Sequence, residues 1–308
     1  MKTFSFLAAA VLAVRVLPIF AQSDYEALSA FYKSATQGET GLSWTAGWMD
    51  STAPCDWGSA YISCNSDDEV TWMEINGEDV GVDGSIPTEF GYLSSMTDLL
   101  LVAGTEKLIG TVPTQLGMMT SLKKEFSYLG QGFSGTIPTE FGQLIALTHK
   151  FRFIANDHVT GTLPTELGML TLLKQKVYFN NNGLTGTIPT EFGRLTLYTK
   201  DFNLATNLLT GSIPSQLALL GEETLAENED AILELNFDTN LLCGDVPAEV
   251  LSITQSDDAV VTIYTDGNSI GTYCAPTPIP SAVPTTSPPS NEPSSLPTAI
   301  PIQSPTGL

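Results

Sequence analysis

The sequence predicts an α/β repeat solenoid, in which short coils of chain stack on one another. An eight-residue phrase, Gly-Thr-Ile-Pro-Thr-Glu-Phe-Gly at residues 135–142, recurs along the middle of the chain. Two apolar residues, separated by one other residue, follow each phrase at a constant distance. Near-copies at almost constant spacing indicate one repeated structural unit. Such a unit buries its apolar face only by stacking on its neighbours.

Each copy of the phrase begins at a glycine, and a truncated copy closes the series. The glycines are Gly84, Gly110, Gly135, Gly161, Gly186, Gly211 and Gly244, with spacings of 26, 25, 26, 25, 25 and 33 residues. Proline at the fourth position of each phrase cannot donate a hydrogen bond to a β ladder. We therefore expect the phrase on the outer, non-strand side of each coil.

The apolar pairs predict one short strand in each coil. The pairs are Leu100/Val102, Phe126/Tyr128, Phe151/Phe153, Val177/Phe179, Phe202/Leu204 and Leu235/Phe237. Alternation with a period of two places both members on one face of a strand, which we expect to face the core. The segment before Gly84 is irregular, and its pattern does not define the register of residues 73–82.

A polar side chain stands three residues beyond each pair, where the strand is expected to bend. These residues are Thr105, Gln131, Asn156, Asn182, Asn207 and Asn240. An asparagine that turns inward there can hydrogen-bond backbone groups that the bend leaves unpaired. Each such group would otherwise cost about 1–3 kcal/mol.

With these residues in place, the unit resembles the plant-type leucine-rich repeat, whose signature is Leu-x-x-Asn-x-Leu-x-Gly-x-Ile-Pro. Residues 24–64, with Pro54-Cys55-Asp-Trp57 and Cys64, resemble the cap that precedes such repeats. The resemblance implies a leucine-rich-repeat right-handed superhelix with a parallel β-sheet on the concave face. We expect a signal peptide at 1–21, an N-terminal cap at 22–69, plant-type repeats at 70–242, a C-terminal cap at 243–274 and a disordered tail at 275–308.

The two ends of the chain predict export. Lys2 followed by the apolar run 4–14 and by Ala21 is typical of a secretory signal, with an uncleaved anchor as the alternative. The tail has ten prolines and eleven serines or threonines among its 34 residues, so it cannot bury enough apolar surface to fold. We expect a secreted, extracellular protein. The tail is either a spacer or an attachment to a cell wall or matrix.

Four cysteines lie where a solenoid needs covers, two before the repeats and two at their end. Pairing Cys55 with Cys64 and Cys243 with Cys274 would staple the two caps. The alternative is a metal site, but zinc ligation favours cysteines two to four residues apart. We therefore expect two disulfides and no metal.

Composition and motifs argue against several classes of function. The chain has 12 Lys+Arg against 34 Asp+Glu, a net charge of −22, which disfavours binding to nucleic acid. Nucleophile-elbow, zinc-hydrolase and phosphate-loop motifs do not occur in the sequence. We expect neither an enzyme nor a cofactor, and no integral membrane segment once the signal is removed.

Positive charge is concentrated in the middle of the chain. Residues 123–200 carry 8 basic and 5 acidic side chains, between flanks with 2 against 15 and 0 against 14. The strand register turns Lys150, Arg152, Lys176 and Tyr178 outward on adjacent strands, with the two lysines side by side. An anionic ligand would relieve the repulsion between them, and the Tyr178 ring offers a stacking surface. These four residues are the candidate ligand-binding site.

A second interpretation of the same residues needs no ligand. Glu125 and Asp201 occupy the equivalent position on the flanking strands, so the charges alternate and would neutralise one another. The acidic insertion 221–231 is interpreted either as a solvated excursion or as a site for a cation or a partner.

The predicted function is non-catalytic, receptor-like recognition of a protein, peptide or anionic polysaccharide ligand outside the cell, on the concave face. The alternative is a structural wall or matrix protein anchored through its Pro/Ser/Thr-rich tail. The sequence does not name the ligand.

Overall fold

In a computed structural model of the chain, we describe residues 24–30, 55, 62–76, 84–103, 108–130, 132–225, 232–253 and 260–274. The chain divides into two units, 1–274 and 275–308. The predicted signal peptide and tail lie outside the described residues. So do Thr105 and Gln131 of the amide series, Trp57 of the predicted cap and residues 226–231 of the acidic insertion.

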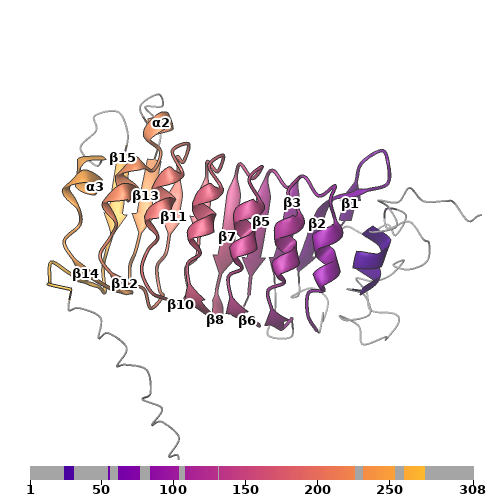
Figure 1. Cartoon of the computed structure of the whole chain (residues 1–308), viewed down its shortest axis with the longest axis horizontal. Helices are drawn as coiled ribbons and strands as arrows, with labels where there is room; N and C mark the ends of the chain where they lie inside the picture. Colours follow the sequence, from indigo (N-terminus) through magenta and orange to yellow (C-terminus); the bar gives the residue numbers. More distant parts are fainter. Residues whose placement is uncertain are drawn as a thin grey trace, which may run out of the picture. The chain divides into compact units, whose positions relative to one another are not determined.

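Each coil of the first unit contributes one strand to a nine-stranded sheet (Figure 1). In spatial order the strands are β1 (Ile62–Cys64), β2 (Val70–Asn76), β3 (Leu99–Ala103), β5 (Glu125–Leu129), β7 (Lys150–Ile154), β9 (Lys176–Tyr178), β11 (Asp201–Asn203), β13 (Ile232–Asn236) and β15 (Val260–Tyr264). Only β1 runs antiparallel to its neighbour; all other pairs in this sheet are parallel. The predicted parallel sheet is confirmed.

The predicted apolar pairs form continuous columns in the core. Phe126 is the cross-strand partner of Phe151, their ring centroids lie 5.2 Å apart, and both are buried. Tyr128 stacks in the same way on Phe153 at 5.4 Å. The structure also supplies the register that the sequence left open before Gly84, because Met73 pairs with Leu100 and Ile75 with Val102.

A column of buried asparagines runs beside the aromatic columns, as predicted. The amide of Asn207 donates to the carbonyls of Phe179 (2.8 Å) and Leu204 (3.0 Å), and its Oδ1 accepts from the backbone N–H of Leu184 (3.2 Å). Asn182 and Asn240 repeat this pattern. Each amide thereby joins backbone groups of its own coil to backbone groups of the preceding coil, in the buried interior.

A second strand in most coils was not predicted. The strands β4 (Gly110–Thr111), β6 (Phe133–Thr136), β8 (Asn156–Thr162) and β10 (Asn182–Thr185) form one sheet, and β12 (Thr210–Gly211), β14 (Leu241–Gly244) and β16 (Ser269–Ile270) form another. The expectation of one strand per coil was therefore wrong. Five of these strands, β4, β6, β8, β12 and β14, contain the phrase glycine in positive-φ backbone, which conceals the period-two pattern in the sequence.

The outer side of the coils carries a row of 3-10 helices, which lie in front of the strands in Figure 1. They are η3 (Thr88–Tyr92), η4 (Thr114–Met118), η5 (Thr139–Gln143), η6 (Thr165–Met169), η7 (Thr190–Arg194) and η8 (Ser215–Leu219), and each follows the phrase proline. Proline is favoured at the start of a helix because the first backbone N–H groups have no partner within the helix, so the N–H that proline lacks costs no hydrogen bond. Two short α-helices, α2 (Glu222–Leu225) and α3 (Ala248–Ile253), follow η8.

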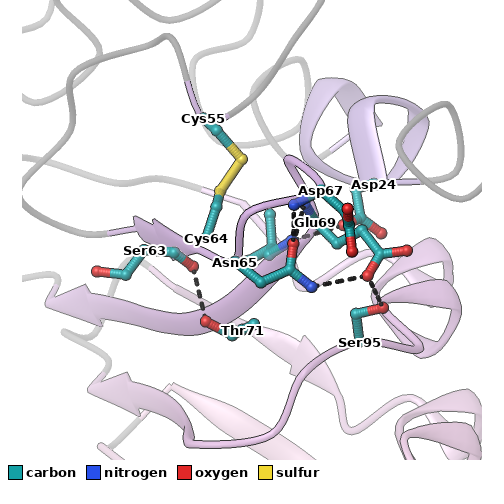
Figure 2. Close-up of a disulfide and its surroundings, with 10 residues drawn as sticks. Asp24, Cys55, Ser63, Cys64, Asn65, Asp67, Glu69, Thr71 and Ser95 are labelled. Carbon is teal, nitrogen blue, oxygen red and sulfur yellow. Dashed lines mark hydrogen bonds between the residues drawn. A yellow bond between two sulfur atoms is a disulfide. The ribbon is translucent and has the colours of Figure 1, made fainter. Parts of the chain in front are cut away.

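A disulfide stands at each end of the stack. Figure 2 shows Cys55 bonded to Cys64 at the end of β1, and the same view includes Asp24, which is buried. Asp24 accepts a hydrogen bond from the backbone N–H of Val70 at 2.8 Å, which ties residues 24–30 to the first parallel strand. Cys243 of β14 is bonded to Cys274, across 31 residues.

Candidate functional site

The outward side chains of β5, β7, β9 and β11 form what we call the strand face: Glu125, Ser127, Lys150, Arg152, Lys176, Tyr178 and Asp201. Lys150 is the cross-strand partner of Lys176, and Arg152 is the partner of Tyr178. The predicted register is thus present. Buried residues alternate with these positions along each strand, so these side chains lie on the face of the sheet opposite the core.

One polar cluster of the strand face is centred on Glu125. Its carboxylate accepts hydrogen bonds from Lys150 Nζ (3.0 Å), from Ser127 Oγ (2.8 Å) and from the Arg152 guanidinium. Burial alone would raise the pKa of Glu125, but the hydrogen bonds from Ser127 and Lys150 and the Arg152 charge outweigh it, so the pKa lies below its ordinary value. The Glu125 side chain is only 13% exposed.

Ser127 is the one member of this cluster that is fully buried, although it points to the outer face of the sheet. The Arg152 Nε lies 2.9 Å from Ser127 Oγ, so the guanidinium covers the hydroxyl and completes its hydrogen bonds. Ser127 was not among the predicted site residues. The available signal for Ser127 was a small polar residue at an outward position next to acidic and basic side chains.

A second cluster joins β9 to β11. Tyr178 donates its hydroxyl proton to Asp201 Oδ2 at 2.6 Å, and Lys176 Nζ lies 3.2 Å from both the Tyr178 hydroxyl and the Asp201 carboxylate. The hydrogen bond with Tyr178, followed by that with Asp201, raises the pKa of Lys176. Burial and the Asp201 carboxylate raise the pKa of Tyr178.

Behind this cluster, a tyrosine that the sequence analysis passed over fixes the two strands. Tyr198 is buried; its hydroxyl accepts from the backbone N–H of Val177 (2.7 Å) and donates to the carbonyl of Asp201. Equivalent positions in the two preceding coils are Leu147 and Leu173. Replacement of leucine by tyrosine in an inward column was the available signal.

The strand face is therefore internally paired, as the second interpretation of the charge pattern expected. Three cations, Lys150, Arg152 and Lys176, face two carboxylates, which leaves a charge of +1. The lysine side chains remain about one-third exposed. Such partly solvated pairs are worth about 0–1 kcal/mol, so a ligand anion can compete for them.

A groove of about 500 Å³ lies between η7 and η8, on the helix side of the coils. Arg194, Glu191, Thr196 and Gln216 line it. Among the described residues, no group of three or more His, Cys, Asp or Glu could hold a metal ion.

No protein-family model matches the sequence, and comparison with curated proteins finds no match. Solved structures do match the fold. The PEPR1–AtPEP1 crystal structure is 24% identical with a TM-score of 0.62, over 81% of this chain and 32% of that chain. The chain has a plant-type leucine-rich-repeat fold.

Two further structures with this leucine-rich-repeat fold differ in how much of them the chain covers. The ectodomain of the Arabidopsis thaliana receptor kinase GASSHO1/SCHENGEN3, solved with CASPARIAN STRIP INTEGRITY FACTOR 2, is 23% identical with a TM-score of 0.58, over 81% of this chain and 30% of that chain. A plant ice-binding protein is 25% identical with a TM-score of 0.57, over 80% of this chain and 72% of that chain.

The leucine-rich-repeat chain thus spans about a third of the length of the two receptor structures. Within the described part of the chain, no helix combines the length and the apolar character that crossing a membrane requires.

Proposed function

We propose that this protein is a non-catalytic extracellular recognition module, which binds an anionic peptide or polysaccharide on its strand face. The observation that carries the proposal is the placement of Lys150, Arg152, Lys176 and Tyr178 on two adjacent strands, in a block that is positive between two acidic flanks. Anions are repelled by the flanks and attracted to this block, which favours one binding register.

The geometry suggests how a ligand carboxylate would be held. Lys150 and Lys176 come from neighbouring strands and turn away from each other toward Glu125 and Asp201. An anion between them would draw both ammonium groups inward at the cost of two weak pairs, while Arg152 keeps Glu125 neutralised. The Tyr178 ring, 5.3 Å from Lys176 Nζ, would stack on a flat group beside that anion.

Secretion and a non-catalytic role are consistent with the same proposal. The two disulfides suit an oxidising compartment. A structural wall or matrix protein, held through residues 275–308, is the alternative. Recovery of the protein from medium rather than from washed wall material, with and without that tail, separates the two.

The binding test compares the native chain with Lys150→Glu/Lys176→Glu on arrays of acidic peptides and acidic oligosaccharides. We expect the charge reversal to weaken binding of the selected ligand about tenfold or more. The control is Lys123→Glu/Arg194→Glu, which makes the same charge change at exposed residues outside the strand face and should leave affinity within a factor of about two. Equal affinity of the native chain and the strand-face variant would remove this site.

A second candidate function is adsorption to ice. The likeness to a plant ice-binding protein supports it, because the chain covers 72% of that structure but only about a third of the receptors. Ice-recrystallisation inhibition by the native chain tests this candidate directly.

A further inference from the structure

An array of small hydroxyl side chains lies on or beside β4, β6, β8, β10 and β12, which belong to two separate sheets away from the strand face. The coils that begin at Gly135, Gly161, Gly186 and Gly211 each offer two such residues, one immediately before and one immediately after the phrase glycine, and the coil at Gly110 offers only the one after it. We call this array the threonine face: Thr111, Ser134, Thr136, Thr160, Thr162, Thr185, Thr187, Thr210 and Ser212. The residues after the glycine are exposed in all of these coils.

The hydroxyl residues meet in pairs across neighbouring strands, because the residue after one phrase glycine lies opposite the residue before the next, as Thr111 does to Ser134. Within β8, Thr160 and Thr162 are both exposed and stand on either side of Gly161, whose positive φ departs from regular strand geometry. Across the strands, Thr136 is the direct partner of Thr160, and Thr162 is the partner of Thr185, which sets a step of about 4.8 Å. The hydroxyls therefore form a continuous staircase over successive coils.

The side chains of the threonine face are held in place. Ser134, Thr185 and Thr210 each donate a hydrogen bond to the glycine carbonyl of the preceding coil, at 3.2–3.4 Å. The methyl groups of Thr136 and Thr162 lie so close to Gly161 and Gly186 that a Cβ on either glycine would come within 2.9 Å of them. Branching at Cβ restricts these rotamers further, so little entropy is lost when a ligand meets the surface.

The array is uncharged, in contrast to the strand face. Its members are threonine and serine, with glycine between them, and the first charged side chain in the next coil is Asp245. His158, two residues before Thr160, is exposed and is the cross-strand partner of Ser134. A charged ligand would gain little binding free energy on this uncharged surface. A surface of ordered water would gain more, because each hydroxyl can bind one water of a lattice while the methyl groups fill the gaps.

We propose that the threonine face binds ice. The inference rests on the second candidate function and adds the surface that carries it. Hydroxyl residues stand side by side on neighbouring strands, about 4.8 Å apart, at Thr136/Thr160 and Thr162/Thr185, so several waters of one crystal face can bind to them at once. The strand face offers no such match, because long charged side chains of alternating sign cover it.

The test uses the full chain and measures ice-recrystallisation inhibition and partition into a growing ice front. Thr136→Lys/Thr162→Lys places two long, charged side chains on the array. We expect the concentration needed for inhibition to rise about tenfold. The control Thr139→Lys/Thr165→Lys makes the same substitution three residues further along the same coils, on the 3-10 helices, and should change it less than twofold. Thermal unfolding shows that each variant is folded, and the single variant Thr162→Lys replaces the pair if the pair is not.

The outcomes separate the site from the function. If the native chain shows no ice activity, the second candidate function and this inference both fail. If it is active but Thr136→Lys/Thr162→Lys and the control behave alike, ice binds elsewhere and only the site is overturned. Retention on insoluble cellulose or chitin, lost in the threonine-face variant while ice activity persists, would overturn ice as the occupant.

Discussion

Lys150 and Lys176 are direct cross-strand partners, yet each ammonium group is paired in the opposite direction. Lys150 Nζ lies 3.0 Å from Glu125 and Lys176 Nζ lies 3.2 Å from Asp201. Like charges placed side by side on a sheet are destabilising, and the two carboxylates on the outer strands offset that cost. The strand face is therefore stable without a ligand and still carries a positive excess.

Glu125→Gln is expected to lower stability by about 1–2 kcal/mol at neutral pH, because Lys150 and Arg152 lose their shared anion. The folded-state pKa of Glu125 is depressed, so its contribution is present above the unfolded-state pKa and is lost as pH falls through the folded-state pKa. Urea unfolding of both proteins between neutral and acidic pH should show the difference shrink toward zero in acid.

Glu140→Gln serves as the control for that experiment. Glu140 accepts only a 3.2 Å hydrogen bond from neighbouring Thr139 on the exposed side of η5. Its substitution should change stability by less than about 0.5 kcal/mol. A Glu125→Gln difference that stays constant with pH would contradict the assigned charge network.

Gly142→Ala is expected to destabilise the stack by at least about 2 kcal/mol. A Cβ at this position would stand 2.6 Å from the carbonyl oxygen of Glu166, so adjacent 3-10 helices would have to separate. In η8 the equivalent residue is Ala218, and no further 3-10 helix follows it in the described part of the chain. Ala218→Gly should cost only about 1 kcal/mol or less, and chemical denaturation compares the two.

Asn207→Ala should be more damaging than Asn156→Ala. Asn207 satisfies three backbone groups, so its loss should cost about 3 kcal/mol or more. Asn156 makes one short hydrogen bond, to Ile154 at 2.9 Å, and its Oδ1 has no hydrogen-bond partner. Equal losses in thermal or urea unfolding would show that the amide column acts through packing rather than through hydrogen bonds.

Removing the disulfides should lower stability unequally. The Cys243–Cys274 bond closes a longer loop than Cys55–Cys64, 31 against 9 residues, so loop-closure entropy gives about 4 against about 3 kcal/mol. Unfolding of the Cys243→Ser/Cys274→Ser and Cys55→Ser/Cys64→Ser variants measures both. A larger loss at the N-terminal bond would mean that packing around Asp24, rather than loop length, dominates there.

Much of the strand face could be predicted because the two-residue alternation along each strand determines which side chains face outward. Once Phe151 and Phe153 face the core, Lys150 and Arg152 must face outward, and the constant spacing places Lys176 and Tyr178 beside them. The pairing within the face could not be predicted. It depends on which rotamer each long side chain adopts, and Arg152 reaches past Ser127 to Glu125 rather than toward Tyr178.

The threonine face shows the opposite case. Its residues are plain in the sequence, but positive-φ glycine separates each pair of hydroxyl residues and breaks the alternation that marks a strand. Neighbouring coils also pair with an offset, so that Thr136 meets Thr160 rather than Thr162. Repeat spacing alone would have aligned the wrong residues.

By itself, the amino-acid sequence determined the repeating coil, the inward columns and the cysteines at the two ends, because these depend on periods of two and of about 25 residues. Only the tertiary structure decided how successive coils are offset, which side chains pair across them and which polar groups are buried. Those features arise from contacts between residues about 25 positions apart, and local pattern carries no information about the side-chain geometry of such contacts.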